Sequence, residues 1–313
     1  MDDKSFSCVI ASNGRDTLFT TALPSALKQS AEFAEILVVY DGQMIFDEKQ
    51  EDFRRAGVSF MCSGKSLGGP YAQFEGYSQA KSDYVVLLDD DDAFDNEFVK
   101  ELRNSLDRHP EKVALIVPSV HKVWPDLPLP TQKINPPCQH SECEGRCLVE
   151  DASWSPPTCS GLTLNRSTFP QLPIMREVRG FNDIQIWRAS QGLKPEAEII
   201  HSPRSVVYFT QSHSFERKTS SFDNRKKNIA QAAEFGITFS NSERNAILFN
   251  AIFSEARSRA YRGELLTAYS WAAEQLRKER LSAFDKGILR SMANIAVTVI
   301  AFVWPRISGR NRI

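Results

Sequence analysis

The sequence has almost no excess charge and few cysteines, and both deficits exclude classes of function. Its 313 residues carry 38 Lys and Arg against 39 Asp and Glu, a formal net charge of −1. Because no basic excess is available to neutralise phosphates, we expect no nucleic-acid partner. Six cysteines in a chain of this size are too few for a disulfide scaffold, and a cytoplasmic setting would keep them reduced or metal-bound.

The start of the chain also lacks the features of a targeting segment. It is acidic and runs directly into the apolar stretch 6–10, with neither a basic n-region nor a long apolar h-region. We therefore expect a cytoplasmic protein. A content of 42% hydrophobic and 25% charged residues is ordinary for a soluble globular chain with one large domain, or one and a half.

What the sequence does contain is an apolar run, residues 84–88, that ends abruptly in Asp89, Asp90, Asp91 and Asp92. The run is typical of a buried strand, and such a strand ends in four carboxylates only where it emerges at a cation or at water. Mg²⁺ and Mn²⁺ take oxygen ligands and bind through one or two carboxylates plus substrate phosphates. A divalent metal site is therefore the first hypothesis.

The first part of the chain alternates apolar strands with helices. Such alternation predicts a parallel sheet with helices on both faces, and ligands of these sheets lie at the carboxyl ends of the strands. The predicted strands are 6–11, 35–40, 58–62, 84–88 and 113–117, and the predicted helices follow Asp16, span 70–81, and run from a cap at Asp95 to Arg108. The polar residues that follow three of the strands, Ser12 to Arg15, Asp41 and Asp89 to Asp92, are expected in one crevice.

After residue 117 this pattern stops, and a Pro- and Cys-rich insertion (121–159) is predicted to lie on the surface. It contains Cys138, His140, Cys143 and Cys147, four soft or borderline ligands compatible with a structural tetrahedral Zn²⁺, with Cys159 as a substitute. Their spacing lacks two CxxC knuckles, so a loop without zinc remains the alternative.

Residues 224–313 are predicted to form a helical C-terminal extension. Ser240 to Glu243 forms a capping box ahead of a helical apolar stripe, and a partner helix follows from Leu265. The uncharged stretch 291–304 precedes basic residues, which suits an interfacial helix on anionic lipid at the inner face of the cell membrane. A buried C-terminal helix is the alternative.

The motifs from residue 6 to about 219 come in the order of the family 2 glycosyltransferases with the GT-A fold, of the bacterial surface-polysaccharide type, and the chain resembles that family. The matching segments are 6–15, 35–42, 82–92, Ser160-Gly161 and 180–187. The resemblance implies a Rossmann-like, mostly parallel α/β sheet flanked by helices over residues 1–223. It also implies inverting transfer from a UDP- or dTDP-sugar to a hydroxyl of a glycan or lipid-linked acceptor.

The resemblance assigns roles to individual residues. Asp183 would be the catalytic base. The Mn²⁺ or Mg²⁺ ligands would be Asp91, Asp89 and His213. The residues implied to bind the nucleotide and donor are Ala11, Ser12, Asn13, Arg15, Asp41, Asp89, Asp90 and Gly161.

Several positions depart from the family pattern. Asn182 and Gln185 stand where the family has acids next to the base, and Gln73 stands where an Arg is frequent. These departures keep two alternatives open: a non-catalytic nucleotide-binding scaffold, and a sugar-1-phosphate nucleotidyltransferase, for which residues 12–15 make a poor phosphate loop. Asp183 also has an alternative role as a helix N-cap.

Overall fold

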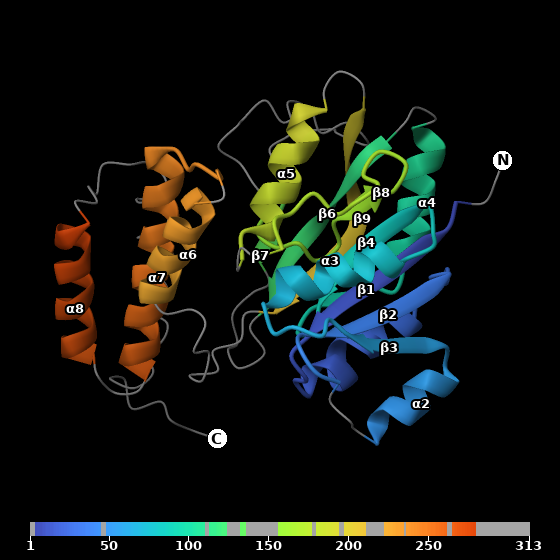
Figure 1. Ribbon diagram of the computed structural model, residues 1–313, viewed down its shortest axis with the longest axis horizontal. Coiled ribbons are helices and arrows are strands. Elements are labelled where there is room, and N and C mark those ends of the chain that lie inside the picture. The colour runs from blue at the N-terminus through green and yellow to red at the C-terminus, as the bar shows by residue number, and fades with distance from the viewer. Residues whose placement is uncertain are drawn as a thin grey trace. The chain divides into compact units, whose positions relative to one another are not determined.

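The computed structural model describes residues 4–44, 48–109, 113–123, 132–135, 156–176, 180–193, 197–210, 222–234, 236–261 and 265–279 (Figure 1). The chain divides into two compact units, Met1–Ser212 and His213–Ile313. The domain boundary predicted after residue 223 falls in the first turn of helix α6 (Phe222–Glu234).

One half of the sheet in the N-terminal unit is parallel. Its strands are β1 (Phe6–Ser12), β2 (Glu35–Tyr40), β3 (Val58–Cys62) and β4 (Tyr84–Asp89), paired in the order β3-β2-β1-β4. Their continuous apolar runs fit this place, because helices cover a parallel sheet on both faces. The predicted α/β fold is confirmed.

The other half of the sheet is mixed. β8 (Thr163–Asn165) pairs antiparallel with both β4 and β6 (Val113–Val123), and β9 (Glu198–Thr210) runs parallel to β6. The short strands β5 (Ala93–Phe94) and β7 (Gln132–Ile134) pair antiparallel with β9 and β6. The sequence predicted a mostly parallel sheet. It did not reveal the antiparallel pairs, because a three-residue strand such as β8 carries no pattern that shows its direction.

The π-helical turn η1 (Leu18–Ala22) and helices α1 (Leu23–Leu27) and α4 (Phe98–Arg108) pack on one face of the sheet. Asp16 does not cap this region as predicted, since η1 has Thr17 at its N-cap without a side-chain hydrogen bond. The Asp16 carboxylate instead binds Lys49 Nζ at 3.1 Å. It therefore stabilises the contact with the neighbouring helix rather than the start of its own.

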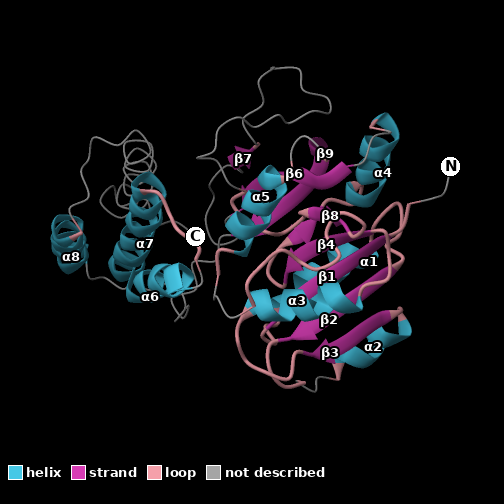
Figure 2. Ribbon diagram, turned by 45° about the horizontal axis from the view of Figure 1, so that its top comes forward, coloured by secondary structure: helices cyan, strands magenta, loops and turns pink. Residues whose placement is uncertain are grey.

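The opposite face is covered by α3 (Gly69–Gln79) and α5 (Asn182–Gly192), which lie on the same side of the sheet in Figures 1 and 2. Gly76 of α3 lies so close to β1 and β2 that a Cβ there would be 2.5 Å from Val9 Cγ1. Helix α2 (Lys49–Arg55) follows η1 and α1 in the chain and contacts β3. Two helical layers therefore enclose the sheet, as the strand and helix alternation predicted.

The C-terminal unit contains α6, α7 (Asn241–Tyr261) and α8 (Leu265–Lys278). The predicted capping box is confirmed: Ser240 Oγ accepts from Glu243 N at 3.2 Å, and Glu243 Oε2 accepts from Ser240 N at 2.8 Å. The helices share a small apolar core of Phe222, Leu248, Ala251, Ile252 and Ala272. Within the described residues, no helix combines the length and the apolar character that crossing a bilayer requires, and the stretch 291–304 lies outside them.

Candidate active site

The strand register brings the predicted site segments to one edge of the parallel half-sheet. Ala11 pairs with Asp89, and Ser12 pairs with Tyr40. Asp41 N donates to Ser12 O at 2.8 Å, so the loop after β1 lies beside the end of β2. The segments that follow these strands are therefore neighbours at one edge of the sheet, as the strand pattern predicted.

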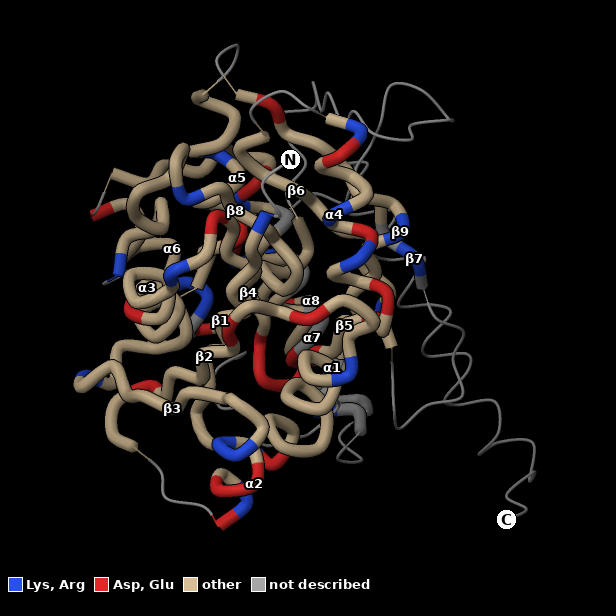
Figure 3. Tube along the Cα trace, turned by 90° about the vertical axis from the view of Figure 1, so that its right-hand side faces the viewer, with Lys and Arg blue, Asp and Glu red and all other residues tan. Residues whose placement is uncertain are grey.

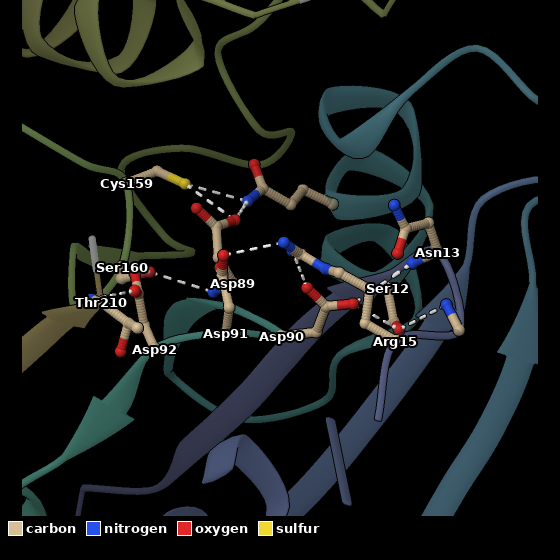
Figure 4. A network of polar contacts seen from close by, with 12 residues as sticks. Ser12, Asn13, Arg15, Asp89, Asp90, Asp91, Asp92, Cys159, Ser160 and Thr210 are labelled. Atoms are coloured by element: carbon tan, nitrogen blue, oxygen red, sulfur yellow. Dashed lines mark hydrogen bonds and ion pairs between the residues drawn. The ribbon is translucent and has the colours of Figure 1, made fainter. Parts of the chain in front are cut away.

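Arg15 connects the loop after β1 to the acidic run (Figure 4). Its guanidinium forms an ion pair with Asp90 and donates from Nη1 to Asp91 Oδ2 at 2.7 Å. Ser12 Oγ also donates to Asp90, at 2.7 Å. Burial lowers the pKa of Arg15, but the nearby charges of Asp90 and Asp91 outweigh it and raise that pKa. The loop after β1 thus places one positively charged side chain against two carboxylates.

Asp92 turns to the other side of the acidic run (Figure 4). Ser160 Oγ donates to its Oδ2 at 2.6 Å, and Thr210 N donates to its Oδ1 at 2.9 Å. Burial and the charges of Asp89 and Asp91 raise its pKa well above the ordinary value, while these hydrogen bonds lower it. Asp92 therefore connects the end of β4 to the 158–161 loop and to the end of β9.

Asp89 lies between these two groups. Gln73 Nε2 donates to Asp89 Oδ1 at 3.1 Å, and the backbone N–H of Asp89 donates to Ser160 Oγ at 3.0 Å. Burial and the charges of Asp91 and Asp90 raise the pKa of Asp89 to about 7. The carboxylate is thus in an environment that a bound cation would stabilise.

Cys159, suggested above as a substitute zinc ligand, lies at the acidic run instead. Its Sγ is 3.0 Å from Gln73 Nε2 and 3.6 Å from Asp89 Oδ1. Burial and the charge of Asp89 raise the pKa of this thiol well above its usual value, which disfavours the thiolate that zinc requires. The four residues of the predicted zinc site, 138, 140, 143 and 147, lie outside the described residues.

Gly161 holds the loop after Cys159 against the end of β4. Its φ is +80°, and a Cβ there would lie 2.4 Å from Val207 Cγ2. Its N–H donates to Leu87 O at 2.7 Å. Only glycine suits this position, because it combines the positive φ with a close approach of the backbone.

Asp41 closes the crevice at the end of β2. Its Oδ1 accepts from Gly68 N at 2.9 Å and its Oδ2 from Ser66 Oγ at 3.2 Å. Each oxygen has a further lone pair, so the carboxylate can also accept from a ligand. Asp41 therefore stays a candidate for contact with a nucleotide.

Asp183 lies in the first turn of α5 rather than at its cap. The N-cap is Phe181, which has a positive φ of 59°, so the alternative role of Asp183 as an N-cap is wrong. The charge of Asp183 contributes to the raised pKa of the Cys159 thiol, as that of Asp89 does. Gln73 links the start of α5 to the end of β4, because it contacts both Asn182 and Asp89.

The residues present fit Mg²⁺ or Mn²⁺ through the chemistry of their donor atoms. They supply hard carboxylate oxygens, and the crowding that raises the pKa of Asp89 would be relieved by a cation. Among the described residues, no group of three or more His, Cys, Asp or Glu is arranged so that it could hold a metal ion by itself. Mg²⁺ is usually held by one or two carboxylates plus substrate phosphates rather than by a protein cage. His213, the third predicted ligand, lies outside the described part of the chain.

Sequence reasoning gave no site role to Gln73 or Thr210, and it named Ser160 only as part of the matching segment Ser160-Gly161. Gln73 lies within a helix, Thr210 contributes only its backbone N–H, and Ser160 is one serine among many. No local pattern distinguishes them, because their contacts are made by distant segments.

In the view of Figure 3 basic and acidic positions are interspersed over the described chain.

Comparison with known proteins agrees with this arrangement. Residues 7–143 match the family model for Glycosyl transferase family 2. A stretch of 99 residues is 28% identical to the glucosyl-dolichyl phosphate glucuronosyltransferase of Haloferax volcanii, and it covers 31% of this chain and 32% of that protein. The match thus spans about a third of the length of this curated relative.

Solved structures of S. aureus TarS residues 1–349 have a similar fold. The complex with UDP has a TM-score of 0.53 at 16% identity, covering 88% of this chain and 90% of that one. The complex with UDP-GlcNAc has a TM-score of 0.51 at 16% identity, covering 91% and 83%. Residues 7–143 are therefore similar to the family 2 glycosyltransferases, and the unit that contains them has the GT-A fold.

Proposed function

We propose that this protein transfers a sugar from a nucleoside diphosphate sugar, with UDP or dTDP as the nucleotide, to a hydroxyl of a glycan or lipid-linked glycan, with inversion at the anomeric carbon. The observation that carries the proposal is the acidic end of β4, Asp89 to Asp92, paired with Arg15 and linked through Gln73 to the start of α5. The family match supports glycosyl transfer.

In the proposed reaction, Asp183 accepts the proton of the acceptor hydroxyl while that oxygen attacks the anomeric carbon. The new bond joins the acceptor oxygen to this carbon. The bond to the nucleoside diphosphate breaks on the opposite side, and its electron pair leaves with the diphosphate. A single carboxylate is sufficient for this step, because an inverting displacement needs one base.

The leaving diphosphate is the part of the donor that the acidic run would face. Asp91 and Asp89 would hold a Mg²⁺ or Mn²⁺, which when bound neutralises charge on the leaving group. Arg15 can contribute a second positive charge, since its guanidinium already lies against Asp91 with Nη1 2.7 Å from Oδ2. Asp90 positions Arg15, and Asp92 holds the 158–161 loop, where Gly161 would pass beneath the donor sugar.

The nucleotide would lie over the ends of β1 and β2, against residues 11–13, with Asp41 accepting from a pyrimidine N–H or a ribose hydroxyl. The UDP and UDP-GlcNAc complexes of the similar TarS structures support a uridine nucleotide. The curated relative is named for a glucosyl-dolichyl phosphate substrate, which supports a lipid-linked acceptor here. Contact of the C-terminal region with an anionic membrane surface remains part of this proposal.

The test is a panel of UDP- and dTDP-sugars incubated with the full chain, Mn²⁺ and glycan or lipid-linked acceptors. We expect release of the nucleoside diphosphate and an acceptor product of inverted anomeric configuration. Nucleotide binding without turnover across the whole panel would contradict the proposal and favour the non-catalytic scaffold, the reading that Asn182 and Gln185 raise.

A further inference from the structure

Gln73 connects the acidic end of β4 to the helix that begins with Asp183. Its side chain is fully buried in the N-terminal unit. Its Nε2 donates to Asp89 Oδ1 at 3.1 Å and to Cys159 Sγ at 3.0 Å. Its Oε1 accepts from Asn182 Nδ2 at 2.5 Å. One buried amide thus contacts three segments that are distant in sequence.

The directions of these hydrogen bonds fix the chemistry of both amides. The Asp89 carboxylate needs a donor, so the NH₂ group of Gln73 faces it and the oxygen of Gln73 faces α5. The residue at position 182 must then donate, which an Asn amide does and an ionised carboxylate cannot. The bond from Asn182 to Gln73 is therefore one that an ionised acid next to Asp183 could not donate.

The bond between Gln73 and Asn182 is made at the first residue of α5, next to Asp183. Ile186 and Trp187 are packed in the apolar core, and Gln185 Oε1 accepts from Met175 N at 2.7 Å. The first turn instead follows Phe181, which adopts the left-handed region. Asn182 is the first residue of the helix, so its bond to Gln73 fixes the turn that carries Asp183.

We propose that Gln73 and Asn182 are a pair of positioning residues that sets the place of Asp183 relative to Asp89 and Asp91. The inference rests on the proposed function, in which Asp183 is the base. A misplacement of about 1 Å in a reacting geometry costs on the order of 100-fold in rate. The pair thus fixes the position of the base relative to the carboxylates that face the leaving group, through two hydrogen bonds.

The test is a double-mutant cycle of Gln73→Met and Asn182→Leu in the full chain, with kcat, donor KM, UDP affinity and Tm measured for each variant. We expect Asn182→Leu to lower kcat about 10- to 100-fold, while UDP affinity stays within about twofold. Gln73→Met should lower kcat similarly and also weaken UDP binding with Mn²⁺, because Asp89 loses a donor. The double variant should have no lower kcat than Gln73→Met, since the two residues act through one bond.

The matched control is Ser190→Ala, which removes a buried side-chain hydrogen bond, from Ser190 Oγ to Ile186 O, in the same helix. We expect it to lower Tm and to leave kcat within about twofold, which separates positioning from general stability. If Asn182→Leu does not fold, Asn182→Asp keeps the shape and replaces the donor with an acceptor, so the same loss of kcat is expected.

Two outcomes would overturn the inference: an Asn182 variant with kcat within about twofold of the wild type, or losses that multiply in the double variant. Failure of the proposed function is recognised separately. It appears as a wild-type protein without transfer activity, or as full activity in Asp183→Asn, and both are measured before the cycle.

Discussion

The end of β4 and the start of α5 form two sides of one site, but they are built differently. At the end of β4, four consecutive carboxylates are bound by the side chains of Arg15, Ser12, Gln73 and Ser160 and by the Thr210 N–H. At the start of α5, a single carboxylate, Asp183, has an amide on one side at Asn182 and another two residues later at Gln185. The end of β4 thus carries four neighbouring carboxylates, whereas the start of α5 carries one.

The physical reason for the difference is the work each side would do. A site for a divalent cation and a diphosphate needs several oxygens, and their mutual repulsion is tolerated because donors and Arg15 surround them. A general base needs one carboxylate with a free proton-accepting oxygen, and added acids nearby would raise its pKa. The neighbouring amides bond elsewhere, Asn182 to Gln73 and Gln185 to Met175 N, and they add no charge beside Asp183.

Asp183→Asn removes the base and leaves the shape of the helix start unchanged. We expect kcat to fall on the order of 1,000-fold, because positioned proton transfer contributes about 100- to 10,000-fold. UDP binding with Mn²⁺ should be unchanged, since the end of β4 is intact. Single-turnover transfer and calorimetric UDP binding measure the two effects. The control is Asp107→Asn, at an exposed position of α4. Retained transfer in Asp183→Asn would contradict the assignment of Asp183 as the base.

Asp91→Ala tests the other side. We expect kcat/KM to fall on the order of 100- to 1,000-fold, because the leaving group loses electrostatic stabilisation. The response of activity to added Mn²⁺ should be lost as well, and a Mn²⁺ titration of transfer measures it. Asp52→Ala on exposed α2 is the matched control. Activity that survives both Asp91→Ala and a chelator argues against the metal role.

Ser160→Ala removes two hydrogen bonds, one accepted from Asp89 N at 3.0 Å and one donated to Asp92 Oδ2 at 2.6 Å. Because Asp92 is buried, we expect a loss of about 2 kcal/mol in the free energy of unfolding and a drop in Tm of about 4–8 °C. Ser78→Ala on α3 removes an exposed hydroxyl and should cost less than about 0.5 kcal/mol. Equal Tm values for the two variants would show that the Asp92 contact contributes nothing.

The pH dependence of stability should reveal the crowding at the end of β4. The pKa of Asp89 is raised to about 7 in the folded protein from an ordinary 3.8, so folding binds a proton at this group. The contribution of Asp89 to the free energy of unfolding is therefore full below about pH 4, and it is lost as the pH rises to about 7. We expect Asp89→Asn to gain stability relative to the wild type by at least about 1 kcal/mol, or about 2–4 °C in Tm, between pH 4 and pH 8.

Thermal melts of both proteins across this range, without divalent cation, measure the difference. A Tm difference that does not change with pH would contradict the raised pKa. UDP with Mn²⁺ should stabilise the wild type more at pH 8 than at pH 5, because the ionised carboxylates bind the cation.

Much of the nucleotide side could be predicted from local sequence. Each of β1, β2 and β4 is an apolar run that ends in polar residues, and parallel strands bring such ends to one edge. Asp183 could be selected through the resemblance to the family. Its place inside the first turn could not, because the left-handed Phe181 that starts the helix has no sequence pattern.

The sequence by itself determined which groups carry the charge of the site: the four carboxylates after β4, Asp41 and Asp183. Only the tertiary structure decided which groups hold them in place. Arg15, Gln73 and Ser160 reach the acids from three separate segments, and Asn182 donates to Gln73 from a fourth. No periodicity of the sequence records a contact between distant residues. Strand patterns depend on near neighbours along the chain, whereas the burial that raises the pKa of Asp89 requires the whole fold.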